Sequence, residues 1–462
     1  MAAINRKPLL LWPLLLLFAL ILLGGTIYIT YFIQRHETGR LLVTYAILFI
    51  AYAGIILLAK SDKEIYLLLG VSLLARFVLL LAIPHLSDDY YRFLWDGMLI
   101  NHGIHPFANV PTTLVAQGYL EQLPPLAPTL YQYMNSPDYF TIYPPVCQAL
   151  FAGAFFLFPN SLEGGIIMLR LPMLVAEGVS IFFIFKLLKI YELPAKYALL
   201  YALNPLVILE LSGNLHFEVL MICFLLVSIY FFQQNRLMLS TVFFGLAICT
   251  KLLPLIFLPL FIRRLGTRKS VYYFGMVGVT CILLFLPLLN IELVKGLQSS
   301  IGLYFQKFEF NASLYYIVRE IGYAVKGFNI IEQAGKWMAI AAFVSIVLFT
   351  LLERCKRLPE AFLWALLIYY LFATIVHPWY VTPLVAFSVF SKYRFAIVWS
   401  LLVFFSYIGY SATGYYEHLM VVFVEYCIIL VVLVYEIGLY ADVGWLKNFL
   451  KKSGLRSASY MQ

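Results

Sequence analysis

Long apolar runs follow one another along most of the chain, and short polar segments separate them. An α-helix needs about 20 predominantly apolar residues to cross the hydrocarbon core of a bilayer, and fewer where the span is short or broken. The pattern therefore predicts an all-α polytopic membrane protein with about fourteen transmembrane helices, several of them short. We place these spans near residues 9–33, 41–59, 65–83, 168–189, 196–211, 218–233, 237–250, 252–265, 271–290, 335–352, 359–376, 379–391, 394–412 and 417–440.

Two long segments interrupt the spans, at residues 84–167 and 291–335. Loops of this length are usually functional or carry secondary structure of their own. Within the first, residues 90–101 predict an amphipathic helix in the membrane interface, and residues 146–158 predict a re-entrant or interfacial helix too short to cross. The chain is thus expected to form one integral-membrane unit, residues 1–462. Its parts are three amino-terminal spans (1–83), the first outer loop (84–167), a membrane core (168–290), the second outer loop (291–335) and the carboxy-terminal spans (336–462).

The composition supports this class and excludes several others. Hydrophobic residues make up 63% of the 462 positions and charged residues only 12%, against about 25% charged in a typical soluble domain. A water-soluble fold could not cover that much apolar surface, and the same numbers exclude a disordered chain, a coiled coil and a collagen helix. The six cysteines are scattered without a CxxC spacing, so we expect neither a disulfide framework nor a zinc site.

The net charge of +9 comes from short clusters of lysine and arginine between the apolar runs rather than from one basic stripe. Such clusters are typical of loops on the cytoplasmic side, so nucleic acid is not an expected partner. With the amino terminus inside, most of the 32 cations fall on cytoplasmic segments, and both termini are cytoplasmic. All seven histidines then fall on the outer face, although longer outer loops would give the same bias.

Residues 85–97, directly after the third predicted span, carry the densest cluster of charges. Asp88 and Asp89 open a helix, where capping and the helix dipole alone would favour carboxylates. Arg92 and Asp96 follow at i+4 and i+8 from Asp88, which puts a cation and a third acid on the same helical face. A capped surface helix does not need that row, whereas a site that binds an anion and removes a proton does.

Other outer turns bring further polar and aromatic groups to the same face. They are Asn214, His216 and Glu218 after the fifth span, Lys251 between two apolar runs, Phe308–Tyr315 with Arg319 in the second outer loop, and His377, Trp379 and Tyr380 after the eleventh span. Simpler interpretations exist, because a lone lysine at this level can snorkel and aromatic residues can form an interfacial belt. Ionisable residues at membrane level are functional hypotheses by default, and we expect Arg76 and Glu177 to form a structural pair. No HxxxH or HxH spacing on a helix supports a metal site.

The segment Ser87–Gly97, followed by His102–Phe107, resembles the first outer loop of GT-C glycosyltransferases. The resemblance is strongest to the bacterial polyprenol-phosphate-mannose-dependent alpha-mannosyltransferases. It covers roughly residues 84–380, whereas the first three spans match only in part, because this chain carries two extra amino-terminal helices relative to many relatives. The further matches, in the same order, are Tyr143–Pro145, Arg170–Pro172, Asn204–Pro205, Gly213–Glu218, Gly245–Ala247 with Thr250–Lys251, and His377–Tyr380.

This resemblance implies a GT-C-like fold and an enzyme that takes a hexose, with mannose as the expected sugar, from a polyprenyl phosphate. The acceptor would be a hydroxyl of a glycan or glycolipid on the extracytoplasmic face, and the membrane the bacterial inner membrane. An aspartate of the first outer loop would act as general base, with inversion at the anomeric carbon. Asp89 fits this role better than Asp88, because Phe93 fills the aromatic position four residues beyond it. Relatives that use monophosphate donors need no metal, so we expect no metal and no other cofactor.

The remaining candidates follow from the chemistry of the leaving group and of the sugar. A lipid phosphate needs cations where its charge develops, for which we consider Lys251 and Arg92 first and Arg319 third. Aromatic rings, including Trp95, would stack on pyranose faces, and the lipid tail would lie near residues 143–158. The complete set of expected substrate-binding residues is Arg92, Asp96, Tyr143, His216, Glu218, Lys251, Arg319, His377, Trp379 and Tyr380.

Three other functions stay open on the sequence. A polytopic transporter or lipid flippase without transferase activity is the first, although transporters place charges near the midplane on broken helices, and no inverted repeat is visible. A non-catalytic scaffold or sensor is the second. A transferase for glucose, arabinose or an aminosugar is the third, because the sequence does not show the hydroxyl geometry that separates mannose from its epimers. Asn311–Ser313 matches a glycosylation sequon, which matters only in a eukaryotic secretory setting.

Overall fold

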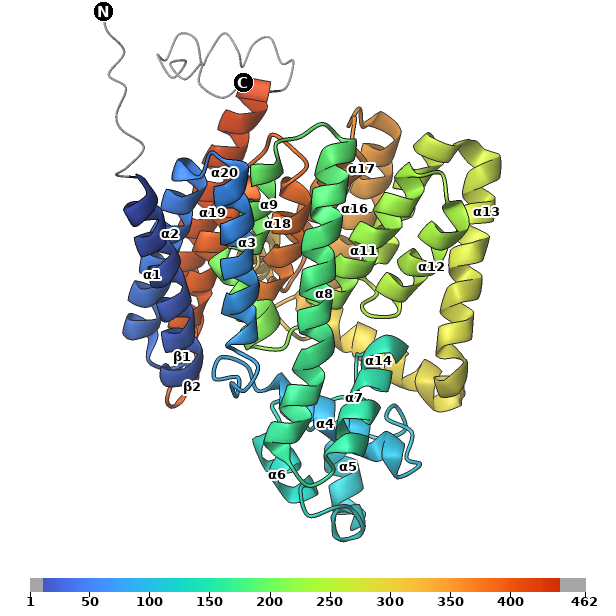
Figure 1. Ribbon diagram of the computed structural model, residues 1–462. Helices are drawn as coiled ribbons and strands as arrows, with labels where there is room; N and C mark the ends of the chain where they lie inside the picture. The colour runs from blue at the N-terminus through green and yellow to red at the C-terminus, as the bar shows by residue number, and fades with distance from the viewer. Residues whose placement is uncertain (1–10, 441–462) are drawn as a thin grey trace, which may run out of the picture.

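The computed structural model describes residues 11–440, and these residues form a helical bundle with one additional short hairpin (Figure 1). The prediction of an all-α membrane protein is confirmed. Arg6, Lys7 and the cations from Lys447 to Arg456, which the topology counts as cytoplasmic, lie outside the described residues. Six described helices are long and apolar enough to cross a bilayer: α1 (Leu11–Phe32), α2 (Thr38–Leu58), α8 (Leu162–Ile190), α13 (Leu260–Phe285), α16 (Ile331–Leu352) and α20 (Leu419–Tyr440).

The described chain reaches seven spans if one broken pair is counted, in which η4 (Ile208–Gly213) and α11 (Glu218–Gln233) meet at 113°. Shorter apolar helices occupy the other predicted runs, so the predicted number of about fourteen spans is not confirmed. These are α3 (Asp62–Phe77), α9 (Ala198–Ala202), α10 (Pro205–Val207), α12 (Leu237–Ile248), α17 (Leu358–Phe372), α18 (Thr382–Ser388) and α19 (Phe395–Leu402), with the short turns η3 (Ala195–Tyr197), η5 (Leu253–Phe257), η7 (Pro378–Val381) and η8 (Val403–Gly409).

One predicted break between spans is present, and one predicted span ends early. Between the runs predicted at 252–265 and 271–290, Gly266 takes a non-helical conformation (φ 71°, ψ 166°), so that two helical parts of α13 meet there at a kink. The run predicted at 394–412 ends in a hairpin of β1 (Tyr410–Ser411) and β2 (Gly414–Tyr415) rather than in a helix. Hydropathy reports the apolar content of a segment but not these local departures from helical geometry.

The first outer loop folds into its own group of helices, which lies below the bundle in Figure 1. The helices expected at 90–101 and 146–158 are present as α4 (Asp89–Asn101) and α7 (Pro145–Leu157), joined by α5 (Pro111–Ala116), η2 (Tyr119–Gln122) and α6 (Ala127–Tyr133). Gly97 lets α4 approach α7 closely, because a Cβ there would lie 2.2 Å from the carbonyl oxygen of Phe151. The rings of Phe93 and Phe151 stack across the same contact at 4.8 Å between centroids.

The second outer loop contains η6 (Leu286–Leu288), α14 (Ile291–Gln306) and α15 (Leu314–Lys326). Phe310, between α14 and α15, forms a parallel bridge to Ile375, which follows α17. Its amide nitrogen donates to the carbonyl oxygen of Thr374 at 3.0 Å, and its carbonyl accepts from the amide of Val376 at 2.8 Å. The loop is therefore tied to the segment that leads into η7.

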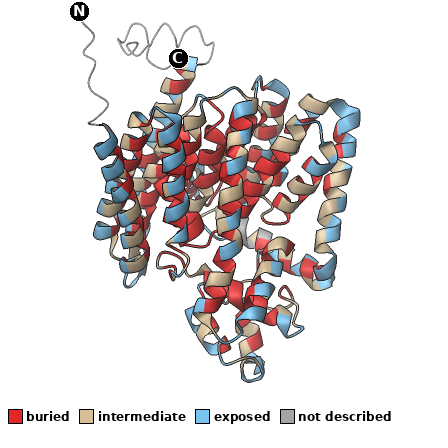
Figure 2. Ribbon diagram, in the orientation of Figure 1, coloured by how far each residue is buried: buried red, intermediate tan, exposed pale blue. Residues whose placement is uncertain are grey.

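Burial is arranged as expected for a multi-pass membrane protein (Figure 2). The central helices α9, α10, α11 and α18 are almost wholly buried, whereas the peripheral helices expose large apolar side chains such as Leu20, Ile282, Phe343 and Val431. Such a surface is compatible with contact to lipid rather than to water. Inside the bundle, Arg76 of α3 and Glu177 of α8 form the expected pair, with Nε and Oε2 3.2 Å apart and both side chains buried.

Candidate active site

A cavity of about 450 Å³ is enclosed by the start of α4, the segment before α7, the turns before α11 and after α12, the second outer loop and the segment around η7. Its walls come from parts of the chain that are far apart in sequence, as expected from the several polar turns that the sequence places on one face. Among the candidates proposed from sequence, the residues that line it are Asp88, Asp89, Arg92, Tyr143, His216, Glu218, Lys251, His377, Trp379 and Tyr380. Asp96 and Arg319 are not among its lining residues.

The two adjacent aspartates have different partners. Asp88 accepts from Arg35 in the loop between α1 and α2, with Oδ2 and Nη2 2.7 Å apart. Asp89 instead accepts from the neutral amide of Asn135, with Oδ1 and Nδ2 2.8 Å apart. Asp88 is therefore neutralised by a guanidinium, whereas Asp89 faces the same cavity without that charge. The guanidinium of Arg35 also lies over the ring of Tyr410, 4.5 Å from its centroid.

Arg92 is held by the protein in a way that the sequence did not predict. Its Nε lies 2.8 Å from Oδ1 of Asp96, one helical turn on, so the i,i+4 pair forms between these two residues and not between Arg92 and Asp88. Its Nη1 donates to the carbonyl oxygens of Ser136 and Tyr139 at 3.0 and 2.9 Å. Asp96 is fully buried and does not line the cavity, so its contact with substrate stays a prediction. Together the pair fixes the loop that carries Asn135.

Lys251 and Glu218 form an ion pair across the cavity wall. Glu218 begins α11 and is 3% exposed, whereas Lys251 follows α12 and keeps 29% of its side chain exposed to the cavity. The ammonium group also lies 4.2 Å from the centroid of the Tyr380 ring, a cation–π geometry. The lysine is therefore oriented from two sides instead of being a freely snorkelling side chain.

His216, Trp379 and His377 form a stack of three rings. The centroids of His216 and Trp379 are 3.7 Å apart and those of His377 and Trp379 are 4.4 Å apart, with interplanar angles of 16° and 13°. Burial, together with the neighbouring His216 and Lys251, lowers the pKa of His377 to about 3, so this imidazole is neutral near pH 7. The stack thus forms a flat aromatic wall next to the charged pair.

The turn that presents His216 is conformationally restrained. Leu215, just before it, is buried and has a φ of 62°, a region that non-glycine residues rarely adopt. Glu210, in the buried turn η4, lies 3.3 Å from Nε2 of His216 and accepts hydrogen bonds from Asn214 and from the hydroxyl of Tyr407. Unusual backbone conformations of this kind cluster at functional sites and persist only where the surrounding packing imposes them.

Two further candidates lie away from the cavity. Arg319 of α15 is paired with Glu309 and Glu320 at 2.7 and 3.1 Å, so its charge is already neutralised. Trp95, on the face of α4 turned toward α6, is fully buried with its ring 6.0 Å from that of Tyr131. The expectation that it stacks on a sugar is therefore wrong. Helical spacing identified the side of α4 that carries charge, but not which residues the neighbouring helices cover.

Several lining residues had not been assigned a role from sequence. Arg35 and Asn135 contact the aspartates, and Tyr410 and Tyr415 come from the hairpin that replaces the end of a predicted span. The Phe308–Phe310 segment was recognised as outer but not as part of this site. The described residues, 11–440, contain no group of three or more His, Cys, Asp or Glu side chains placed to hold a metal ion. The expectation that no metal is needed stays a prediction.

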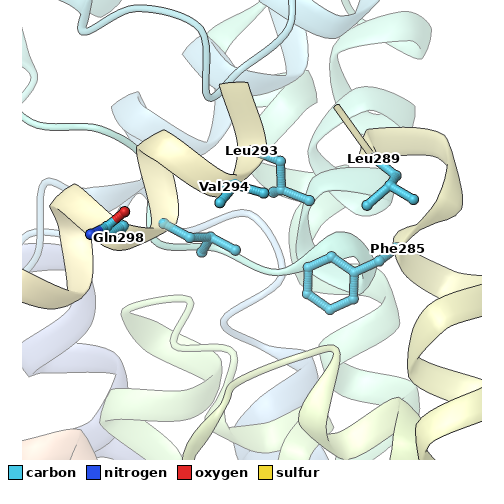
Figure 3. Close-up of a pocket in the computed structure, with 6 residues that line it drawn as sticks. Phe285, Leu289, Leu293, Val294 and Gln298 are labelled. Carbon is cyan, nitrogen blue, oxygen red and sulfur yellow. The ribbon is translucent and has the colours of Figure 1, made fainter. Parts of the chain in front are cut away.

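A second, apolar groove lies beside this cavity and is shown in Figure 3. It measures about 500 Å³ and runs between the end of α13 and the side of α14. Its lining residues are Phe285, Leu289, Leu293, Val294, Leu297 and Gln298. The same helix carries Ser300, which lines the polar cavity and donates to the carbonyl oxygen of Thr141 at 3.2 Å. Thus α14 borders both spaces.

Comparison with known proteins supports the resemblance found in the sequence. The model of a family described as alpha-(1->6)-mannopyranosyltransferase, N-terminal domain, matches residues 37–265. Alpha-(1->6)-mannopyranosyltransferase B of Corynebacterium glutamicum is 29% identical over 154 residues, which cover 33% of this chain and 24% of that protein. The aligned part is thus about a quarter of the relative. The resemblance to bacterial alpha-mannosyltransferases is confirmed, and the matched region contains Asp88, Asp89, Glu218 and Lys251 but not Arg35 or the cavity wall from Ser300 to Tyr415.

Proposed function

From this similarity to alpha-mannosyltransferases we propose that the protein transfers mannose from a polyprenyl-phosphate donor to a hydroxyl of a glycan or glycolipid. The observation that supports the proposal is that Asp89 and Lys251 line the same cavity. The site would face the extracytoplasmic side of the bacterial inner membrane, with both termini in the cytoplasm. We propose no metal requirement, since Lys251 supplies a positive charge for the leaving phosphate.

We assign Asp89 as the general base. A sugar hydroxyl is a poor nucleophile, and a positioned carboxylate that accepts its proton contributes about 10²–10⁴-fold in rate. Asn135 orients one oxygen of Asp89 without neutralising its charge. Asp88 is less suited, because Arg35 engages it directly. We therefore propose that the ion pair of Asp88 and Arg35 has a positioning role at the edge of the cavity.

We assign Lys251 to the leaving phosphate. In the reaction, the acceptor oxygen bonds to the anomeric carbon, the bond from that carbon to the phosphate oxygen breaks, and the hydroxyl proton passes to Asp89. Direct displacement inverts the anomeric centre. Negative charge then develops on the lipid phosphate, where a preorganised cation is most effective. Glu218 and Tyr380 orient the ammonium for this role, and the ring stack of His216, Trp379 and His377 forms an adjacent face for the sugar.

The polyprenyl tail has to leave the cavity into an apolar environment. We place it in the groove beside α14 rather than near residues 143–158. The groove is lined almost wholly by apolar side chains, and its helix also borders the polar cavity through Ser300. A donor could thus keep its phosphate near Lys251 while its isoprenoid chain lies against Leu293 and Leu297.

The test is transfer of radiolabelled sugar by the purified protein in lipid nanodiscs. Polyprenyl-phosphate-mannose is compared with polyprenyl-phosphate-glucose, each with and without EDTA, for wild type, Asp89→Asn and Asp88→Asn. We expect EDTA-insensitive consumption of the mannose donor, a loss of about 10²–10⁴-fold in Asp89→Asn and a smaller loss in Asp88→Asn. Full turnover by Asp89→Asn would contradict its role as base. Failure of wild type to consume either donor, with movement of labelled lipid between leaflets, would replace the transferase by a transporter.

A further inference from the structure

One wall of the cavity is aromatic and comes from other segments of the chain than Asp89 and Lys251. Phe308 and Phe310 of the second outer loop line it together with Tyr139 and with Tyr415 of the hairpin. The rings of Tyr139 and Phe308 meet edge to face at 5.1 Å, and those of Phe310 and Tyr415 stack at 5.2 Å. Phe308 and Tyr415 are 36% and 40% exposed, so their rings remain available to a ligand.

Between the two phenylalanines lies a carboxylate that the protein holds in place. Oε1 of Glu309 accepts from Arg319 at 2.7 Å, and Oε2 accepts from the hydroxyl of Tyr315 at 2.7 Å and from Asn329 at 3.2 Å. The side chain is still 27% exposed and lines the cavity. A carboxylate oxygen has more than one lone pair, so Glu309 can also accept hydrogen bonds from a ligand.

The backbone of this wall is fixed to the bundle. Phe310 is bridged to Ile375, and the next residue, Asn311, has a φ of 45° and donates its amide hydrogen to Glu417. Tyr415 is held opposite Tyr410 in the hairpin. The rings and the carboxylate therefore form a prearranged surface, for which a ligand need not bear the cost of ordering a loop.

We propose that Phe308, Glu309, Phe310 and Tyr415 form the acceptor subsite, and that its ligand is a neutral saccharide. The inference rests on the proposed function, which it extends to the acceptor. Aromatic faces pack against the apolar faces of a sugar ring, while a fixed carboxylate accepts hydrogen bonds from its hydroxyls. An anionic acceptor would be disfavoured here, because the cation behind the wall, Arg319, is already paired with two carboxylates.

The positions of these residues along the chain are consistent with one subsite for the donor and another for the acceptor. Asp89 and Lys251, assigned to proton and phosphate, lie within the region that matches the mannosyltransferase family, residues 37–265. The aromatic segment 308–310 and Tyr415 lie beyond it. A saccharide on the aromatic wall shares the cavity with Asp89, as the transfer of a proton to that carboxylate requires.

The experiment separates binding of the acceptor from use of the donor. A soluble alpha-mannobioside serves as acceptor for wild type, Phe308→Ala, Tyr415→Ala and Glu309→Gln in nanodiscs. We expect each substitution to raise the KM for the mannobioside about tenfold, which corresponds to about 1.4 kcal/mol. The KM for the donor and the slow hydrolysis of donor without acceptor should stay at the wild-type values, because Asp89 and Lys251 are untouched.

Two matched control variants and a binding measurement test this interpretation. Phe328→Ala and Tyr416→Ala remove exposed rings from the same loop and the same hairpin, but neither residue lines the cavity. Saturation-transfer NMR of the mannobioside reports binding without catalysis. The inference is overturned if the controls raise the acceptor KM equally, if the donor KM rises instead, or if wild type hydrolyses donor yet neither binds nor uses the mannobioside. If wild type consumes no donor, the proposed function fails, while loss of the NMR signal in Phe308→Ala would still support a saccharide site.

Discussion

At the level of single residues, the stack of His216, Trp379 and His377 shows how burial determines charge. His377 is confined between an aromatic ring and a cavity that also contains Lys251. Because the pKa of His377 is about 3 in the folded protein, its imidazole stays neutral between pH 6.5 and 3, where the imidazole of the unfolded chain would bind a proton. A neutral ring here avoids placing a second cation beside Lys251.

This property predicts an acid sensitivity with a definite sign. Because the unfolded chain binds the extra proton, His377 destabilises the fold as the pH falls from 6.5 towards 3, by about 2 kcal/mol at pH 5. We expect His377→Gln, which does not titrate, to lose less thermal stability than wild type between pH 7 and pH 5. Melting of both proteins in detergent at the two pH values measures this. Equal losses would show that His377 is not the group that responds.

Most of the candidate site residues proposed from the sequence line the cavity, but their pairings could not be predicted. Asp88 and Arg92 share a helical face, yet Asp88 pairs with Arg35, 53 positions away, and Arg92 pairs with Asp96. Local spacing can place a side chain on a face of a helix. It cannot identify a partner from another loop, nor show that α7 and the segment before it cover part of that face.

At the level of elements, the contact between α4 and α7 positions the start of α4 and with it both aspartates. Gly97 permits this contact, since a Cβ there would meet the carbonyl of Phe151 at 2.2 Å. Gly153, on α7 itself, has open space around its Cβ direction. Gly97 therefore lies at the contact between the two helices, whereas Gly153 does not and provides a matched control.

We expect Gly97→Ala to destabilise the first outer loop by about 1–3 kcal/mol, the usual cost of overpacking, and to reduce transfer because Asp89 moves with α4. Gly153→Ala should be neutral or slightly stabilising, since alanine is the better helix former. Thermal melts and initial transfer rates of the two variants provide the comparison. A Gly97→Ala protein with wild-type stability and rate would show that the close approach is not needed.

Much of the element layout could be predicted, because apolar runs of helical length leave a strong signal. The expected helices at 90–101 and 146–158 appear as α4 and α7, within one residue at each boundary. The breaks at Gly266 and between residues 213 and 218 also fall between predicted spans. The hairpin at 410–415 was not predicted, because it depends on local backbone conformation, which hydropathy does not report.

At the level of the whole molecule, the polar cavity and the apolar groove border two parts of α14. Under the proposed function, this helix separates the site of sugar transfer from the lipid tail of the donor. A polar substitution in the groove should therefore raise the KM for a long-chain donor more than the KM for a short-chain donor. Val294 is 54% exposed and lines the groove, whereas Val325, on α15, is 76% exposed and does not. Both valines are thus exposed, but only Val294 borders the groove.

We expect Val294→Asp to raise the KM for a long polyprenyl-phosphate-mannose about tenfold, because each buried methylene contributes about 0.8 kcal/mol. The KM for a farnesyl-phosphate donor should change little, as should both values in Val325→Asp. Kinetics with the two donors in nanodiscs measure the contrast. A rise that is the same for both donors would place the lipid tail elsewhere.

The bridge between Phe310 and Ile375 has a consequence for how such a site can diversify. Ile375 lies two residues before His377. One backbone segment, 375–377, therefore holds both Phe310 of the aromatic wall and His377 of the ring stack. The main-chain hydrogen bonds of this bridge do not depend on the side chain at position 308. Under the proposed assignment, a different side chain there would change the acceptor that is recognised, while the backbone of the wall keeps its place relative to His377.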